Sequence, residues 1–157
     1  MTSMTFSDHR PHLPDPQTDP QFFTGVLPKR IVAWFIDAVL GFVGGLLLAL
    51  ILGIFTLGLG FLAAPLMIAG FGFAYRALSL IKWSATPGMI FLGLQYRDLG
   101  GLRLDRQTAL VHSGIWMLTM AVMIGWFISM VTILGTRLNQ GLPDLLAGTV
   151  LINRPID

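Results

Sequence analysis

Residues 28–41, PKRIVAWFIDAVLG, determine how this chain is interpreted, because they place an acidic residue inside an otherwise apolar segment. Two basic residues, Lys29 and Arg30, begin the stretch, and Asp37 follows Arg30 by seven positions. Apart from Asp37 the sequence stays apolar as far as residue 55, which exceeds the about 20 residues that a helix needs to cross a bilayer. The stretch therefore predicts a membrane-spanning helix that contains one carboxylate.

The composition is that of an integral membrane protein. Apolar residues make up 54% and charged residues 11% of the 157 positions, and the mean hydropathy is +0.74. The chain has no cysteine, which excludes disulfides, iron–sulfur clusters and thiol catalysis. All eight acidic residues are aspartates, so acid–base groups are scarce, and we expect neither an enzyme nor a cofactor or metal. The net charge of +2 indicates no nucleic-acid partner, and the expected surroundings are the lipid bilayer.

Three apolar runs are long enough to cross a membrane. They cover residues 31–55, 61–81 and about 109–134, and they lack the polar face of a soluble helix. We therefore expect an all-α integral membrane protein with three transmembrane helices, formed by residues 28–154. Residues 1–27 contain four prolines and three aspartates without apolar periodicity, which predicts a disordered N-terminal tail.

Basic residues predict the orientation of these spans. They gather before the first span and between the second and third: Lys29 and Arg30, then Lys82, Arg97, Arg103 and Arg106. The positive-inside rule then places the N-terminus and the central loop in the cytoplasm. We favour one crossing by the third run, since 26 residues are too few for two full spans, and this puts the C-terminus outside. The alternative is a run bent near Gly125 into two half-crossings, which returns the C-terminus to the cytoplasm.

The loop between the second and third spans predicts a small β-hairpin at the membrane surface. A Thr-Pro-Gly turn at residues 86–88 is followed by LQYRD and LRLD, two short alternating segments that flank a Gly-Gly turn. An amphipathic helix is the competing interpretation of this loop.

Asp37 and Arg76 are expected to form an ion pair between the first two spans. Asp37 lies seven residues from Arg30, about 10 Å at helical rise, and Arg76 lies six residues from Lys82, about 9 Å. An antiparallel hairpin therefore brings the two charges to the same depth, where an isolated charge is costly. We favour a fixed structural salt bridge; the alternative is an ion- or proton-binding carboxylate on a transport path.

Small residues recur on the face of the first span that carries Asp37. They are Ala33, Gly41 and Gly45, spaced by four positions around the aspartate, and such a stripe lets another helix approach closely. This face is expected to meet protein and not lipid. His112, near the start of the third run, is interpreted as a hydrogen-bonded structural residue in preference to a titrating one.

Three segments resemble the RDD family of bacterial membrane proteins, which is named for one arginine and two aspartates. They are the arginine and aspartate at positions 30 and 37, TPGMIFLGLQYRD at residues 86–98, and GLPDLLAGTVLI at residues 141–152. The resemblance covers residues 28–154, and by motif position the three named residues are Arg30, Asp37 and Asp144. It implies a multi-pass protein of the bacterial plasma (inner) membrane.

Three positions depart from the family pattern. Met89, Pro143 and His112 stand where members commonly carry positive or histidine side chains, so positive charge is lost from the cytoplasmic side. This argues against an anion- or headgroup-binding role. Asp144 precedes a short apolar segment, where it could cap a helix as readily as bind an ion.

Two functions are expected. The resemblance implies a transport-type protein, and sodium–proton antiport has been ascribed to some members of the family. Three spans enclose little volume, so we expect movement of a small cation or proton through a homo-oligomer, with Asp37 as the polar site. The alternative is a non-catalytic accessory or assembly subunit that docks on a larger membrane complex through its glycine-rich helix faces.

Overall fold

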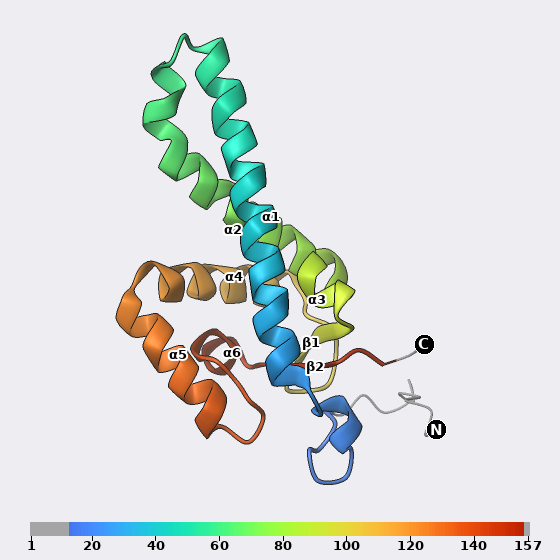
Figure 1. Cartoon of the computed structure of the whole chain (residues 1–157). Helices are drawn as coiled ribbons and strands as arrows, with labels where there is room; N and C mark the ends of the chain where they lie inside the picture. The colour runs from blue at the N-terminus through green and yellow to red at the C-terminus, as the bar shows by residue number, and fades with distance from the viewer. Residues whose placement is uncertain (1–12, 156–157) are drawn as a thin grey trace.

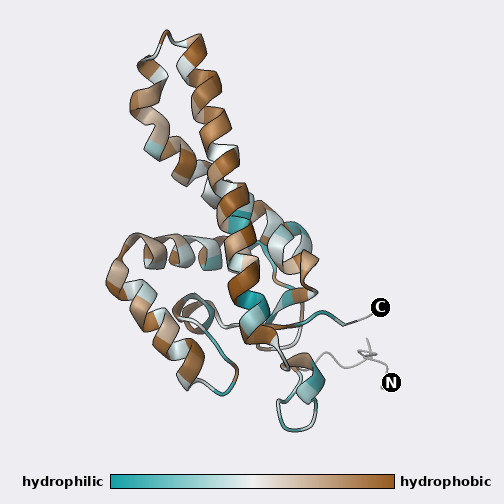
Figure 2. Cartoon of the chain, in the orientation of Figure 1, coloured by the Kyte–Doolittle hydropathy of each residue, from teal (hydrophilic) through white to brown (hydrophobic). Residues whose placement is uncertain are grey.

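The structure is a computed structural model that describes residues 13–155. Its most prominent feature is an antiparallel hairpin of two long helices, α1 (Val26–Phe55) and α2 (Ala64–Trp83), joined by the short 3-10 helix η2 (Leu59–Ala63). The hairpin extends well beyond the rest of the molecule (Figure 1). Both helices are long and apolar enough to cross a membrane, and the projecting part is mostly hydrophobic, with pale stretches between the brown ones (Figure 2). The prediction of a helical protein with apolar helices of membrane-spanning length is therefore confirmed, and the predicted all-α class is corrected by a small two-stranded sheet.

The two hairpin helices pack through the stripe of small residues on α1. Ala33, Gly41 and Gly45 are all buried, and a Cβ atom at Gly45 would lie only 2.6 Å from the Cα atom of Ile68. Because glycine has no side chain there, the backbones of α1 and α2 come close together. The stripe faces protein, as the sequence predicted.

The third apolar run is not one straight helix. It forms α4 (Arg106–Ala121) and α5 (Met123–Gly135), whose axes differ by 116°, with Val122 in an extended conformation between them. The absence of a side chain at Gly125 permits the bend, because a Cβ atom there would lie 3.0 Å from the carbonyl oxygen of Thr119. The favoured single straight helix is therefore wrong and the bent alternative is observed, three residues before the predicted position. A third span exists only if the bent pair is counted as one.

A small sheet is present, but it is not the predicted hairpin. Strand β1 (Leu94–Asp98) pairs antiparallel with β2 (Thr149–Asn153) from the C-terminal segment, and Asp98 faces Thr149. The Gly-Gly turn does form, since the backbone N–H of Leu102 donates to the Asp98 carboxylate at 2.7 Å. The second predicted arm, residues 102–105, is not a strand. All five residues of β2 are buried, which explains why this apolar segment replaces it.

The C-terminal segment therefore lies at the same end of the hairpin as the N-terminus of α1 and the central loop. The Nζ atom of Lys29 in α1 donates to the Asn153 side chain at 2.7 Å. Two short helices complete this end, α3 (Pro87–Phe91) before β1 and α6 (Leu142–Ala147) before β2 (Figure 1). The prediction that the C-terminus lies on the opposite side is wrong, because the bend between α4 and α5 turns the chain back.

Part of the predicted disordered tail is folded. The 3-10 helix η1 (Pro20–Phe22) precedes α1, and Phe22 is buried against Val150 and Ile152 of β2. The Asn153 side chain also donates to the carbonyl oxygens of two residues before α1. Disorder is therefore the wrong prediction for residues 13–27, whereas residues 1–12 lie outside the described part of the chain.

Candidate functional site

Asp37 accepts hydrogen bonds from three donors. The Tyr75 hydroxyl of α2 donates to one carboxylate oxygen at 2.8 Å, and the backbone N–H of Gly88 donates to the same oxygen at 2.9 Å. The hydroxyl of Thr86, the N-cap residue of α3, donates to the other oxygen. Asp37 thus fixes the Thr-Pro-Gly turn against α1, and its oxygens are held by donors from α2 and from the loop.

Gly88 allows this arrangement because the turn touches the backbone of α1. A Cβ atom at Gly88 would lie 2.5 Å from the carbonyl oxygen of Ala33 and 2.9 Å from the Asp37 carboxylate. Any larger residue would push the turn away from Asp37 and lengthen the hydrogen bonds.

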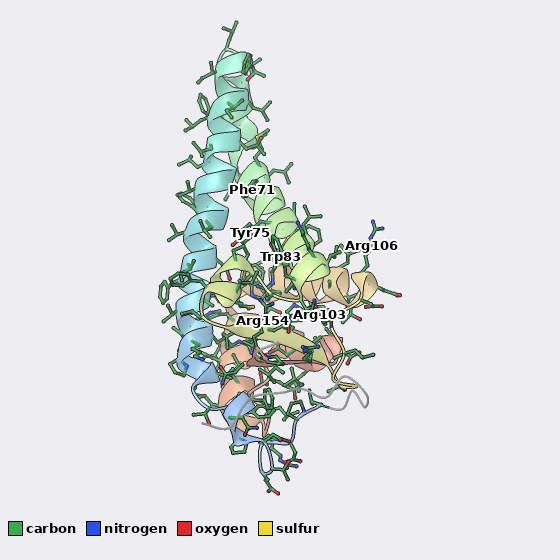
Figure 3. All side chains as sticks on the ribbon, turned by 90° about the vertical axis from the view of Figure 1, so that its right-hand side faces the viewer. Phe71, Tyr75, Trp83, Arg103, Arg106 and Arg154 are labelled. Atoms are coloured by element: carbon green, nitrogen blue, oxygen red, sulfur yellow. The ribbon has the colours of Figure 1, made fainter. Side chains whose placement is uncertain are left out.

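The predicted ion pair between Asp37 and Arg76 is wrong. Within residues 13–155 no salt bridge joins them, and the Arg76 guanidinium instead lies over the ring of Trp116 in α4, 4.5 Å from its centroid. Successive residues of a helix point about 100° apart, since 3.6 residues make a turn. Tyr75 therefore occupies the position toward α1, where it lies with Phe71 between the two helices (Figure 3), and Arg76 turns toward α4.

The depth of Asp37 explains how α1 accommodates an acid. Eighteen residues separate it from the end of α1 at Phe55, about 27 Å at helical rise, and a bilayer core is about 30 Å thick. The carboxylate therefore lies at the end of the hairpin that holds the N-terminus of α1 and the loop after α2, which is called the inner end below. The loop supplies its donors there.

The second aspartate of the motif pairs with the arginine. The Asp144 carboxylate, fully buried in α6, lies 2.6 Å from the Arg30 guanidinium of α1 and 2.9 Å from Nε2 of His112 in α4. It also accepts the backbone N–H of Gly141 at 2.9 Å. One carboxylate therefore joins α1, α4 and α6 in a cluster that depends on the return of the C-terminal segment. The structural role expected for His112 agrees with this contact.

The cluster keeps Asp144 ionised. Burial by itself would raise the pKa of Asp144, but the charge of Arg30 and the hydrogen bonds from His112 and Arg30 outweigh it and hold the pKa well below its usual range. Nδ1 of His112 has no hydrogen-bond partner within residues 13–155, so a neutral ring with its proton on Nε2 fits best. The cluster then holds one positive and one negative charge.

Comparison with known proteins identifies the family. A protein-family model described as the RDD family matches residues 24–148. The chain belongs to the RDD family. Comparisons with curated proteins and with solved structures found no match. In this RDD protein the three motif residues fall into two clusters, with Arg30 and Asp144 in one and Asp37 in the other.

A cavity of about 560 Å³ lies between the hairpin and the bent pair α4–α5 of the RDD chain. Three of the four predicted site residues, Arg30, Asp37 and Arg76, line it, whereas Asp144 lies behind Arg30. Tyr96 of β1 also lines the cavity, and the part formed by these four side chains, Arg30, Asp37, Arg76 and Tyr96, is called its polar end. Burial raises the pKa of the Tyr96 phenol, and the positive charges of Arg30 and Arg76 oppose that rise, so the phenol lies near both guanidinium groups.

Sequence reasoning missed most of the partners of the motif residues. Tyr75, Thr86 and Gly88 bind Asp37, and Trp116 stacks on Arg76, yet none was selected as a site residue. The Thr-Pro-Gly turn was the one available signal, because its hydroxyl and free N–H are donors of the kind that a nearby carboxylate needs. Within the described chain no group of three or more metal-ligating side chains occurs.

Proposed function

We propose that this RDD protein is a transport-type protein of the bacterial inner membrane, and that its ligand occupies the cavity at the inner end of the hairpin. The observation that carries this proposal is a 560 Å³ cavity, lined by Arg30, Asp37 and Arg76, in a chain of otherwise apolar helices. Ionisable groups in such surroundings are costly and commonly mark ligand paths. The positive-inside rule supports a cytoplasmic location for the end that holds the N-terminus, the loop and the C-terminus.

The contacts favour Arg76 over Asp37 as the charged group that meets the ligand. A cation needs free oxygen ligands, whereas the oxygens of Asp37 already accept from three donors. Arg76 forms no ion pair with any carboxylate in residues 13–155. An anionic ligand therefore fits the cavity better than the cation or proton expected from the sequence. The sequence argued against an anion-binding role because positive charge is lost at positions 89, 112 and 143, but Arg30 and Arg76 keep positive charge on the cavity wall.

The shape of the chain supports an oligomer for transport. The cavity lies within one copy, but beyond it the hairpin consists of α1 and α2 alone, with Phe55 and Leu62 exposed by 82% and 85%. Two helices cannot enclose a path, so movement across the outer half of the membrane requires further copies.

The accessory-subunit alternative receives less support. That interpretation requires glycine-rich helix faces that are free to dock on another protein. The stripe of Ala33, Gly41 and Gly45 is buried inside this chain and is not free. A docking role would have to use the large apolar surfaces on the outside of α1 and α2.

Liposomes that contain the purified chain test the proposal. One arm follows labelled inorganic phosphate and the movement of fluorescent phosphatidylglycerol between leaflets; the other follows the loss of a proton or sodium gradient. We expect movement of an anionic probe, reduced about tenfold or more by Arg76→Gln, since a hydrogen bond to a charged group is worth about 1.5–3 kcal/mol. Asp37→Asn, which keeps an acceptor oxygen, and Arg106→Gln on the exposed start of α4 should transport normally.

Two results would contradict the proposal. Dissipation of a cation gradient that is lost in Asp37→Asn and kept in Arg76→Gln would restore the carboxylate as the transport group. Absence of movement for every probe, together with copurification at a fixed ratio with a larger complex, would establish the accessory role.

A further inference from the structure

Arg76 is the least compensated charge in the cavity. The residue is 95% buried, since its relative exposure is 5%, and its Nε atom has no hydrogen-bond partner among residues 13–155. Its guanidinium contacts the face of Trp116 and forms a hydrogen bond with the Tyr96 phenol, and neither group contributes a negative charge. An arginine stays protonated in proteins, so this charge cannot be removed by loss of a proton.

The other charges that line the cavity already have partners. Arg30 is bound by Asp144, and Asp37 is bound by the donors of Tyr75, Thr86 and Gly88. A buried charge without a counter-charge is strongly unfavourable. The polar end of the cavity therefore lacks one negative group, placed against Arg76.

The rest of the cavity is apolar and reaches the outer surface of the helices. Its walls include Gly72 and Met120, and three aromatic residues on its lining are also exposed: Trp34, Phe42 and Trp126, by 39%, 55% and 47%. Phe42 belongs to the part of α1 that is long and apolar enough to cross a membrane. A ligand that enters between such side chains comes from the bilayer, and the chain that it brings must itself be apolar.

We propose that the cavity binds one anionic lipid molecule, with the phosphate or carboxylate oxygens of its headgroup on Arg76 and an acyl chain along the apolar wall. Guanidinium groups bind these oxyanions through paired N–H donors, and basic pockets between membrane helices on the cytoplasmic side bind lipid headgroups. The volume of 560 Å³ lies within the range of about 300–1,000 Å³ that is typical of ligand pockets. The lipid supplies the missing negative charge without any change in the two motif clusters.

This inference shares its cavity with the proposed function, but it concerns equilibrium binding, so each can fail separately. Native mass spectrometry of the full chain in a neutral detergent measures binding of short-chain phosphatidylglycerol, of phosphatidylcholine with the same acyl chains, and of inorganic phosphate. We expect phosphatidylglycerol to bind about tenfold or more tightly than phosphatidylcholine, and inorganic phosphate to bind weakly because it has no acyl chain. Arg76→Gln should abolish the preference, and Arg106→Gln, whose side chain points away from the bundle (Figure 3), should keep it.

A second variant tests the acyl-chain position without removing charge. Gly72 lines the cavity one turn before Arg76, and a Cβ atom there would meet nothing within 4 Å, so Gly72→Leu can fold while it fills the apolar part. It should weaken binding of phosphatidylglycerol about tenfold or more and keep the melting temperature.

The inference is overturned if the two lipids bind alike to the unmodified chain, if Arg76→Gln keeps the preference, or if Gly72→Leu binds normally. Binding of inorganic phosphate as tight as that of phosphatidylglycerol would assign the site to a soluble oxyanion. An Arg76-dependent lipid preference without any transport would leave the inference standing and refute the proposed function.

Discussion

Asp144→Asn is expected to lower the free energy of unfolding by about 3–5 kcal/mol, the usual cost of removing one partner from a buried ion pair. The variant keeps the shape of the side chain but removes the charge that faces Arg30 at 2.6 Å and His112 at 2.9 Å. Arg30 would remain largely buried, with 15% of its side chain exposed, and without a counter-charge. Unfolding of the purified protein in detergent, followed by circular dichroism against denaturant, measures the loss.

An exposed aspartate provides the matched control. Asp15 pairs with Arg137 at 2.8 Å, but their side chains are 47% and 59% exposed, so Asp15→Asn should cost less than about 1 kcal/mol. Equal losses in the two variants would show that the cluster around Asp144 is not buried as described.

The Asp144 carboxylate makes the stability of the chain depend on pH in a defined direction. The folded-state pKa of Asp144 lies below its ordinary value near 3.8, so its contribution is fully present above that value and is lost as the pH falls toward the folded-state pKa. The unmodified chain should therefore lose stability below about pH 4, and Asp144→Asn should lack this part of the decline. An unchanged acid profile in the variant would contradict the ion pair.

Asp37→Ala is the second large loss that we expect, about 2–4 kcal/mol, because donors near the inner end of the hairpin lose their acceptor. The Thr86 hydroxyl is fully buried, and the Gly88 N–H lies against α1, so neither can readily turn to water. The loss should appear as reduced unfolding free energy and as faster proteolysis at the Thr-Pro-Gly turn.

Two substitutions separate this effect from the mere loss of an acid. Asp98→Ala removes a carboxylate that accepts a backbone N–H at an exposed turn, and it should cost less than about 1 kcal/mol. Asp37→Asn retains an oxygen for Tyr75 and Gly88 and should recover most of the stability. If Asp37→Ala were as mild as Asp98→Ala, the three hydrogen bonds would not hold the turn.

The sequence predicted the local features of the hairpin well. The length of the first two runs, the small-residue stripe and the membrane class depend on composition and spacing along one helix, and all of them agree with the structure. The resemblance to the RDD family is confirmed by the family model that matches residues 24–148. These are properties that a single helix or a short segment carries in its own residues.

Features that depend on rotation or on distant segments were not predictable in this way. Helical rise gave Asp37 and Arg76 equal depth, but the one-residue difference that turns Tyr75 toward α1 and Arg76 toward Trp116 depends on how α2 and α4 pack. The pairing of β1 with β2 joins residues more than fifty positions apart, and a local hairpin was the simpler expectation. The bend at Val122 brings Asp144 to Arg30, so the salt bridge could not be inferred while the side of the C-terminus was open.

The C-terminal segment returns to the inner end of the hairpin, and cross-linking can test this placement. Asp98 faces Thr149 in the sheet, and the backbone N–H of Asp98 donates to the carbonyl oxygen of Leu102, away from β2. Asp98 and Thr149 therefore form a non-hydrogen-bonded pair, whose Cα atoms lie about 4.5 Å apart, within the range of a disulfide. Because the chain has no native cysteine, Asp98→Cys with Thr149→Cys can be oxidised in native membranes, with Asp98→Cys and Thr56→Cys at the far end of the hairpin as the control. We predict a cross-link in the first pair and none in the second. The placement would be contradicted if the first pair failed to cross-link and if a cysteine at position 153 were labelled only from the membrane side opposite to a cysteine at position 98.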